Sequence, residues 1–166
     1  MERDEREFTD FYLAARDDCL RVVLTVVGDR ELAQDLVAEA FTRAWRAWRT
    51  VRQHPASRAW VVRTALNTRV SWWRRRRREI TVASHDDTEA ASPHPALDIC
   101  LVVALRRLPV RQREVIALRV LLDLDTATTA ETLGMPSGTV ASHLSRGLAT
   151  LRRELVSADD HEERVT

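Results

Sequence analysis

Two short stretches of this chain carry side chains suited to contact with nucleic acid. In the first, Trp73 is followed by consecutive arginines. Guanidinium groups bind phosphate bidentately, and an indole beside them can stack on an unpaired base. Adjacent cations repel on a helix, so the run needs solvent or an anion. The alternative is a core residue, Trp72, followed by a solvated charge run. We predict a nucleic-acid contact at Trp73, Arg74, Arg75, Arg76, Arg77 and Arg78.

The second stretch has the pattern of a helix, a tight turn and a second helix. Gly134 and Pro136 mark the turn. Apolar residues then recur at spacings of 4, 4, 3 and 4, which is one core-facing seam: Val140, Leu144, Leu148, Leu151 and Leu155. Projecting from the other side we expect Thr139, Ser142, His143 and Arg146, which can reach base edges. The pattern predicts a helix-turn-helix whose second helix enters a DNA groove. An ordinary helical pair with a solvated polar face is the alternative.

Other side chains with chemical potential give weaker patterns. Asp35 and Glu39 lie one helical turn apart, so they could be paired catalytic carboxylates. We favour an acidic face that docks on a basic partner. The five histidines and two cysteines lack metal-ligand spacing, and neither a nucleophilic triad nor a phosphate-binding glycine loop is present. We therefore expect no enzyme activity, metal, cofactor or small-molecule substrate.

Composition indicates helices that position these residues. The chain has 166 residues, enough for one domain or two small ones, with only 4 Gly and 5 Pro. Apolar residues recur at spacings of three and four, which predicts an all-α fold. The net charge of +1 conceals a strongly basic segment, 51–80, with 9 Arg against one acid. Such asymmetry favours polyanion binding by one segment rather than by the whole surface.

The pattern divides the chain into two small helical domains. We expect a helix over 5–27, a second one that is capped by Asp29 and runs to about Arg49, and a third over 58–78 with Ser57 as its cap. Phe41, Trp45 and Trp48 form a buried stripe on the second helix. Domain 1–79 is followed by a flexible linker, 80–96, rich in polar residues and proline. Domain 97–157 has four helices, includes the wing-free helix-turn-helix and precedes an acidic disordered tail, 158–166. Cys19 and Cys100 suit reduced core thiols. Without a membrane span or leader, we expect a soluble, cytoplasmic protein.

These motifs resemble a known family. The segment from Asp29 to Trp45 is similar to region 2 of the extracytoplasmic-function (ECF) sigma factors, compact bacterial transcription initiation factors. The segment from Leu108 to Leu155 is similar to their region 4. Ser71-Trp72-Trp73 followed by arginines further resembles an actinobacterial SigE-type branch. The resemblance covers nearly the whole chain and implies a promoter-specificity subunit that acts on core RNA polymerase.

The resemblance also implies roles for individual residues. Asp35 and Glu39 match the surface that docks on the clamp helices of the polymerase β′ subunit. Contacts with the melted −10 strand would come from His54, Ser57, Arg63, Asn67 and Ser71, with Arg74 to Arg78 on backbone phosphates. The last helix would read the −35 element near the β flap. An anti-sigma factor is a further expected partner; membrane insertion is not expected.

Several positions depart from the family pattern, among them Thr128, where many relatives carry Glu. Ala38 stands where glutamine is common, and Ala141 and His143 replace residues that are often Lys and Arg. We therefore expect a weaker or differently shaped clamp contact and weaker −35 binding. Two alternatives stay open: a stand-alone helix-turn-helix regulator, and a sigma-like co-regulator that has lost initiation.

Overall fold

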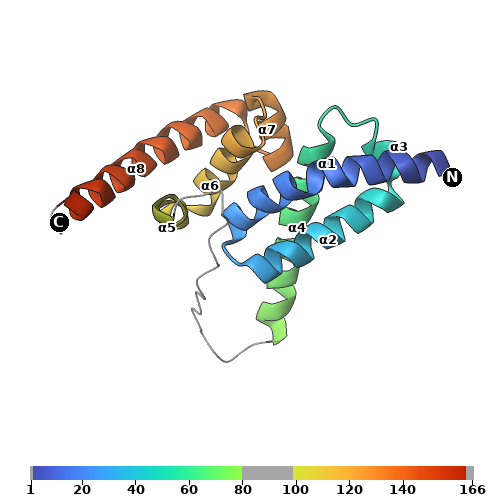
Figure 1. Cartoon of the computed structure of the whole chain (residues 1–166), viewed down its shortest axis with the longest axis horizontal. Coiled ribbons are helices and arrows are strands. Elements are labelled where there is room, and N and C mark those ends of the chain that lie inside the picture. Colours follow the sequence, from blue (N-terminus) through green and yellow to red (C-terminus); the bar gives the residue numbers. More distant parts are fainter. Residues whose placement is uncertain (1, 80–98, 164–166) are drawn as a thin grey trace. The chain divides into compact units, whose positions relative to one another are not determined.

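The protein is built from helices in two compact units. A computed structural model describes residues 2–79 and 99–163, with side chains for 2–69 and 101–156. Every element in these ranges is helical (Figure 1). The chain divides into unit 1, Met1–Ala91, and unit 2, Ser92–Thr166. The expected all-α fold with two helical domains is confirmed. The predicted linker, 80–96, lies outside the described residues.

Unit 1 is a bundle of three long helices and one short one. These are α1 (Glu2–Val27), α2 (Arg30–Arg46), α3 (Trp48–Val51) and α4 (Ser57–Glu79). In it α1, α2 and α4 pack pairwise against one another (Figure 1). Their shared interior is aliphatic, and its fully buried side chains include Cys19, Val22, Val23, Val26, Val61 and Val62. Burying these residues supplies the main driving force for the unit.

The turn from α1 to α2 follows the expected capping chemistry. The Asp29 carboxylate accepts a hydrogen bond from the Leu32 backbone N–H at 2.9 Å, as an N-cap residue does. Farther along, the Arg58 guanidinium pairs with Asp18 at 3.0 Å and so ties the start of α4 to α1. The register between the helices is therefore set by polar contacts as well as by the core.

An aromatic cluster closes the other end of unit 1 and corrects one expectation. The predicted single helix over 29–49 ends at Arg46, because Ala47 leaves helical geometry at φ −105° and ψ 21°. Trp48 then opens α3 and is 7% exposed, packed edge-on against Phe8. Trp45, expected in the core, is 40% exposed although its ring also contacts Phe8. Both indoles contact Phe8, but only that of Trp48 is buried.

The described part of unit 2, residues 99–163, contains five helical segments. They are α5 (Ile99–Arg107), α6 (Val110–Ile116), the π-helical η1 (Ala117–Leu121), α7 (Thr126–Leu133) and α8 (Ser137–Glu163). The long α8 packs against α5, α6 and α7. A Cβ on Gly147 of α8 would lie 2.6 Å from Ile116 Cδ1, so glycine permits the close approach of α8 to α6. That contact positions the helix that carries the predicted reading face.

The end of α8 differs from the expected tail. We expected disorder from 158, but the helix continues to Glu163. After Gly147 the sequence contains neither glycine nor proline before the helix ends, so the i→i−4 hydrogen-bond ladder is not interrupted.

The helix-turn-helix itself is formed as predicted from its turn residues. The Asp125 carboxylate caps α7 by accepting from the Thr128 N–H at 2.7 Å, and this hydrogen bond lowers the pKa of Asp125. At the other end Gly134 adopts the left-handed conformation, with φ 64° and ψ 40°. The Met135 N–H then reaches the Ala130 carbonyl at 3.0 Å. The turn is thus fixed by one carboxylate and one glycine.

Replacing Gly134 by alanine is expected to destabilise unit 2. A Cβ at this position meets nothing within 4 Å, so the cost comes from the positive φ alone, about 1–2 kcal/mol. The matched control is Gly138→Ala, which adds the same methyl group in open space within α8 and should be neutral or stabilising. Urea unfolding of both variants measures the difference. Equal free energies of unfolding would contradict the assignment of strain to Gly134.

Candidate functional site

The acidic pair on α2 lies on the exposed side of the helix. Asp35 and Glu39 are both exposed, and the buried residues Leu36, Val37 and Ala40 face the opposite way. The Glu39 carboxylate pairs with Arg43 at 2.8 Å. An exposed pair of this kind lacks the contrasting environments that separate a catalytic acid from its base. The geometry therefore favours a docking face over the catalytic alternative.

The loop between α3 and α4 is tightly hydrogen-bonded. His54 and Ser57 are both half-buried. The Ala56 N–H donates to His54 Nδ1 at 3.0 Å. We expected Ser57 to cap α4, but its hydroxyl donates backwards, to the Val51 carbonyl at 2.9 Å and the His54 carbonyl at 3.2 Å. The side chain thus closes the loop on itself and does not cap α4.

A long-range contact anchors the same loop, and the sequence analysis missed it. Arg52 Nη1 lies 3.2 Å from both Asp4 Oδ1 and Glu7 Oε2 on α1. These partners are 48 and 45 positions away in the sequence. A local pattern therefore contains no signal for the pairing. These ion pairs hold the loop against α1.

The next predicted residues line up along α4. Arg63 and Asn67 are both exposed and lie one turn apart, whereas Val62 and Leu66 are buried. Ser71 follows four positions after Asn67 on the same helix. The helix backbone continues through Arg74 to Arg78 and ends at Glu79. The side chains of Ser71, Trp73 and these arginines lie outside the described residues.

The predicted reading face lies on the first turns of α8. Ser142 and Arg146 are exposed, as expected, while Thr139 is half-buried and Val140 is fully buried. His143 differs from the expectation of a freely projecting side chain. It is half-buried, and its Nδ1 is buried with no hydrogen-bond partner. Arg146 is therefore the most accessible cation among these four residues.

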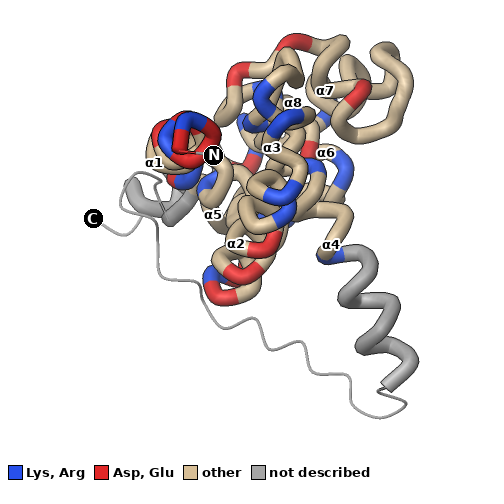
Figure 2. Tube along the Cα trace, turned by 90° about the vertical axis from the view of Figure 1, so that its right-hand side faces the viewer, with Lys and Arg blue, Asp and Glu red and all other residues tan. Residues whose placement is uncertain are grey.

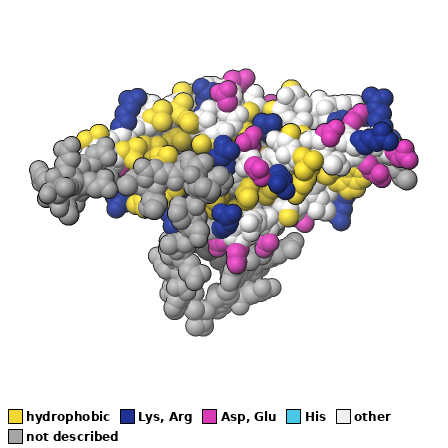
Figure 3. All heavy atoms as spheres, in the orientation of Figure 1, with side chains coloured by type: hydrophobic (Ala, Val, Ile, Leu, Met, Phe, Trp, Pro, Cys, Tyr) yellow, Lys and Arg dark blue, Asp and Glu magenta, His cyan; other side chains and the backbone are white. Residues whose placement is uncertain are grey.

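Several charged side chains elsewhere pair with each other. At the N-terminal end of α1, Arg and Asp/Glu side chains gather together (Figure 3), and Figure 2 shows the same alternation along the α1 trace. Two pairs there are Arg3 with Glu7 at 2.8 Å and Arg6 with Glu2 at 3.8 Å. In unit 2 the buried Glu114 pairs with Arg111 at 2.9 Å. The two exposed pairs on α1 contribute little to stability individually.

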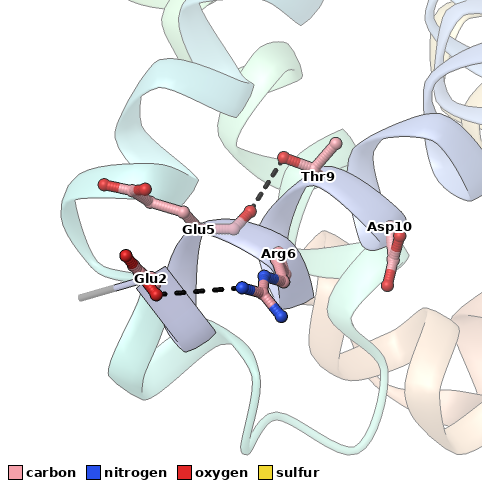
Figure 4. Close-up of a pocket in the computed structure, with 5 residues that line it drawn as sticks. All are labelled: Glu2, Glu5, Arg6, Thr9 and Asp10. Carbon is pink, nitrogen blue, oxygen red and sulfur yellow. Dashed lines mark hydrogen bonds and ion pairs between the residues drawn. The ribbon is translucent and has the colours of Figure 1, made fainter.

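One hollow in the described surface lies on these first turns of α1. Its lining is Glu2, Glu5, Arg6, Thr9 and Asp10 (Figure 4). All five come from one helix, and the Thr9 hydroxyl donates to the Glu5 carbonyl at 2.8 Å. A ligand site normally combines polar groups converging from several elements. We therefore interpret this hollow as an irregularity of the α1 surface and not as a ligand site.

Neither metal nor thiol chemistry is indicated within the described ranges. In those ranges, groups of three His, Cys, Asp or Glu side chains placed to hold a metal ion are absent. Burial raises the pKa of the Cys19 thiol to about 12, which keeps it protonated and unreactive. Among the same residues, none of the helices combines the length and apolar character needed to cross a bilayer.

Both halves of the chain match known protein families. Residues 11–79 match the family described as Sigma-70 region 2, and residues 98–151 match Sigma-70, region 4. The RNA polymerase sigma-E factor of Streptomyces coelicolor is 36% identical over 159 residues, covering 92% of this chain and 88% of the relative. The ECF RNA polymerase sigma factor SigL of Mycobacterium tuberculosis is 33% identical over 150 residues, or 81% of each chain.

Solved structures show the same fold. The sigma factor RpoE from Bartonella quintana, crystallised with the anti-sigma factor NepR, matches with a TM-score of 0.77 and 24% identity, covering 90% of this chain and 97% of RpoE. CnrH, in complex with the cytosolic domain of CnrY, matches with a TM-score of 0.66 and 22% identity, covering 93% of this chain and 90% of CnrH. At these identities the likeness concerns the fold.

Proposed function

Because this chain belongs to the extracytoplasmic-function family of RNA polymerase sigma factors, which direct polymerase to promoters, we propose that it acts through three separate surfaces. The observation that carries this is the presence of both family regions in one chain, at 11–79 and 98–151. The protein works by binding, without catalysis of its own, and acts in the cytoplasm, where polymerase and DNA meet. The proposed division of labour is a region 2 domain, 1–79, a linker, 80–96, and a region 4 domain, 97–157.

The first surface is the exposed face of α2, which docks on the β′ clamp helices. Asp35 and Glu39 supply its negative charge, and Ala38 beside them is also exposed. Arg43 shares the Glu39 carboxylate. Opposite charges across an interface mainly set the association rate and the register. Ala38 lacks the polar contact that a glutamine at this position would supply to the face. Core binding and initiation therefore need to be tested separately.

The second surface takes up the melted −10 strand. The loop at His54 and Ser57 and the α4 face with Arg63, Asn67 and Ser71 contact extruded bases. Trp73 and the arginines from Arg74 to Arg78 hold the strand by stacking and by phosphate contacts. Extruding a base costs stacking energy, and a prearranged loop reduces the further cost of ordering the protein. The hydrogen bonds of Ser57 and Arg52 support this role.

The third surface is the start of α8, which enters the major groove of the −35 element near the β flap. Thr139, Ser142, His143 and Arg146 form its reading face. An anti-sigma factor is the further partner we propose, since the structures of RpoE and CnrH both contain a second protein in complex.

Arg146→Ala is expected to weaken −35 binding by about 1–3 kcal/mol, or about five- to 150-fold, if the guanidinium contacts guanine bidentately. Arg152→Ala is the matched control: it removes the same charge from an exposed site on the same helix, pointing away from the Arg146 face. Binding of holoenzyme to duplexes with each −35 base replaced measures the effect. Similar losses in both variants, independent of sequence, would argue for a general charge effect.

Run-off transcription with bacterial core polymerase and a library of random promoters tests the whole proposal. Transcripts that depend on this protein are the expected result, and they yield the −35 and −10 sequences together. Core binding without transcripts would indicate a sigma-like co-regulator. Absence of both would indicate a stand-alone helix-turn-helix regulator, and the proposed function would then be wrong.

A further inference from the structure

One imidazole in the loop between α3 and α4 has a fixed hydrogen-bonding character. His54 Nδ1 accepts the Ala56 N–H at 3.0 Å. A ring nitrogen that accepts a hydrogen bond carries no proton, so the neutral imidazole must carry its proton on Nε2. Pro55 has no N–H, which leaves Ala56 as the first backbone donor after the ring. The arrangement is that of an Asx turn, with an imidazole nitrogen replacing the usual side-chain oxygen.

The surroundings of the ring hold it in place. The His54 N–H donates to the Val51 carbonyl at 3.1 Å, and the His54 carbonyl accepts from the Ser57 hydroxyl at 3.2 Å. Arg52 ties the preceding residue to α1 through Asp4 and Glu7. The backbone N–H, the backbone carbonyl and the Nδ1 atom of His54 are therefore all hydrogen-bonded within the loop. The ring is half-buried, and within the described residues Nε2 has no hydrogen-bond partner.

We propose that His54 is a fixed hydrogen-bond donor for an unpaired base of the melted −10 strand. Nδ1 maintains the loop, and Nε2–H is offered to an acceptor on the base edge, either a ring nitrogen or a carbonyl oxygen. A base that presents an exocyclic amino group at that point would leave two donors facing each other. Unlike an asparagine or glutamine amide, the locked ring cannot turn to accept. This inference rests on the proposed role of the loop and assigns a specificity-determining residue within it.

The expected consequence is a base preference that depends on the ring. Facing donors leave both groups without partners, and one such mismatch is expected to change affinity by about tenfold. The effect should be confined to one nucleotide position of the melted strand. Contacts with phosphates should be unaffected, since they do not distinguish bases.

Two substitutions of His54 test the role of Nδ1 and the role of Nε2 separately. In His54→Asn the side-chain oxygen can take the place of Nδ1 and accept from Ala56, because asparagine forms this turn readily, but nothing reaches the position of Nε2. In His54→Gln the longer amide can supply a donor near the Nε2 position, but the Ala56 N–H loses a well-placed acceptor. Asparagine should therefore keep the stability of the chain and lose the base preference. Glutamine should keep part of the preference and lower the thermal stability.

Two measurements test the inference. The first is a long-range ¹H–¹⁵N correlation spectrum of the full-length protein, which reports the tautomer of His54 without polymerase or DNA. The expected signature is protonation at Nε2 only, and an Nδ1-protonated neutral ring would overturn the inference. The second is binding of the holoenzyme to forked promoters whose sequences come from the run-off transcription experiment. Each unpaired −10 position carries each of the four bases in turn.

The outcomes distinguish this inference from the proposed function. Loss of about tenfold discrimination at one position in His54→Asn, with unchanged thermal unfolding, is the expected result. If the wild-type holoenzyme discriminates bases and His54→Asn discriminates them equally, the donor role is wrong while the sigma function stands. If the wild-type holoenzyme shows no preference in the melted strand, the proposed role of the loop and this inference are both overturned.

Discussion

Replacing Arg75 and Arg76 together by alanine is expected to flatten the salt dependence of promoter binding. Each phosphate contact contributes about 0.7 to the slope of log K against log salt for single strands and about 0.9 for duplex, so the double variant should lose about 1.4–1.8. The reason is that each neutralised phosphate releases condensed counterions on binding. Because the affinity of the variant depends less steeply on salt than that of the wild type, the loss of affinity should be larger at low salt than at high salt. Titrations of holoenzyme on one promoter at several salt concentrations measure it.

The matched control removes two arginines of unit 1 that already have acidic partners. Arg3 and Arg6 are highly exposed and pair with Glu7 and Glu2 on their own helix. Alanine at both positions makes the same change in net charge and should leave the slope unaltered. An unaltered slope in the Arg75 and Arg76 variant as well would assign the arginine run to solvent. An equal decrease in both variants would assign the effect to net charge.

Leu118→Ala is expected to cost unit 2 about 2–5 kcal/mol, because it removes a fully buried side chain and leaves a cavity. At about 0.05–0.15 kcal/mol per residue, a unit spanning 92–166 has about 4–11 kcal/mol of stability. The loss is therefore a large share of the total. Since α7 and α8 pack in the same unit, −35 binding should fail before core binding does.

The chain supplies both a control and a selective probe for this prediction. Val120 lies in the same segment, η1, but is 56% exposed, so Val120→Ala should change stability by less than about 0.5 kcal/mol. All five tryptophans belong to unit 1, so their fluorescence follows that unit alone. In Leu118→Ala, the circular dichroism transition should shift to lower urea while the fluorescence transition stays in place. Equal shifts in both variants would show that Leu118 has no special role in the core.

The helix-turn-helix could be predicted because its determinants are local. Asp125 caps α7 through a residue three positions away, and Gly134 supplies the left-handed conformation that ends the helix. The apolar seam through Val140 and Leu151 follows from the helical period alone. Capping, turn geometry and periodicity each depend on a few neighbouring residues. The resemblance of the same short segment to region 4 of the sigma factors then predicts its function, which is −35 binding.

The exposed faces of α2 and α4 were also predictable, for the same reason. Asp35, Glu39, Arg63 and Asn67 are all exposed, and the residues between them alternate with helical spacing. Their nucleic-acid and polymerase contacts stay predictions. The sequence pattern places these side chains on a surface but does not say what covers it.

The sequence by itself determined the all-α class, the Asp29 cap of α2 and the turn that forms the helix-turn-helix. Only the tertiary structure decided which of Trp45 and Trp48 is buried, because that depends on where Phe8, some 40 positions earlier, meets the break at Ala47. It likewise joined Arg52 to Asp4 and Glu7 and turned the Ser57 hydroxyl back into the loop. Local hydrogen-bond geometry can be deduced from neighbouring residues. Contacts between distant segments exist only once the chain has folded and brought them together.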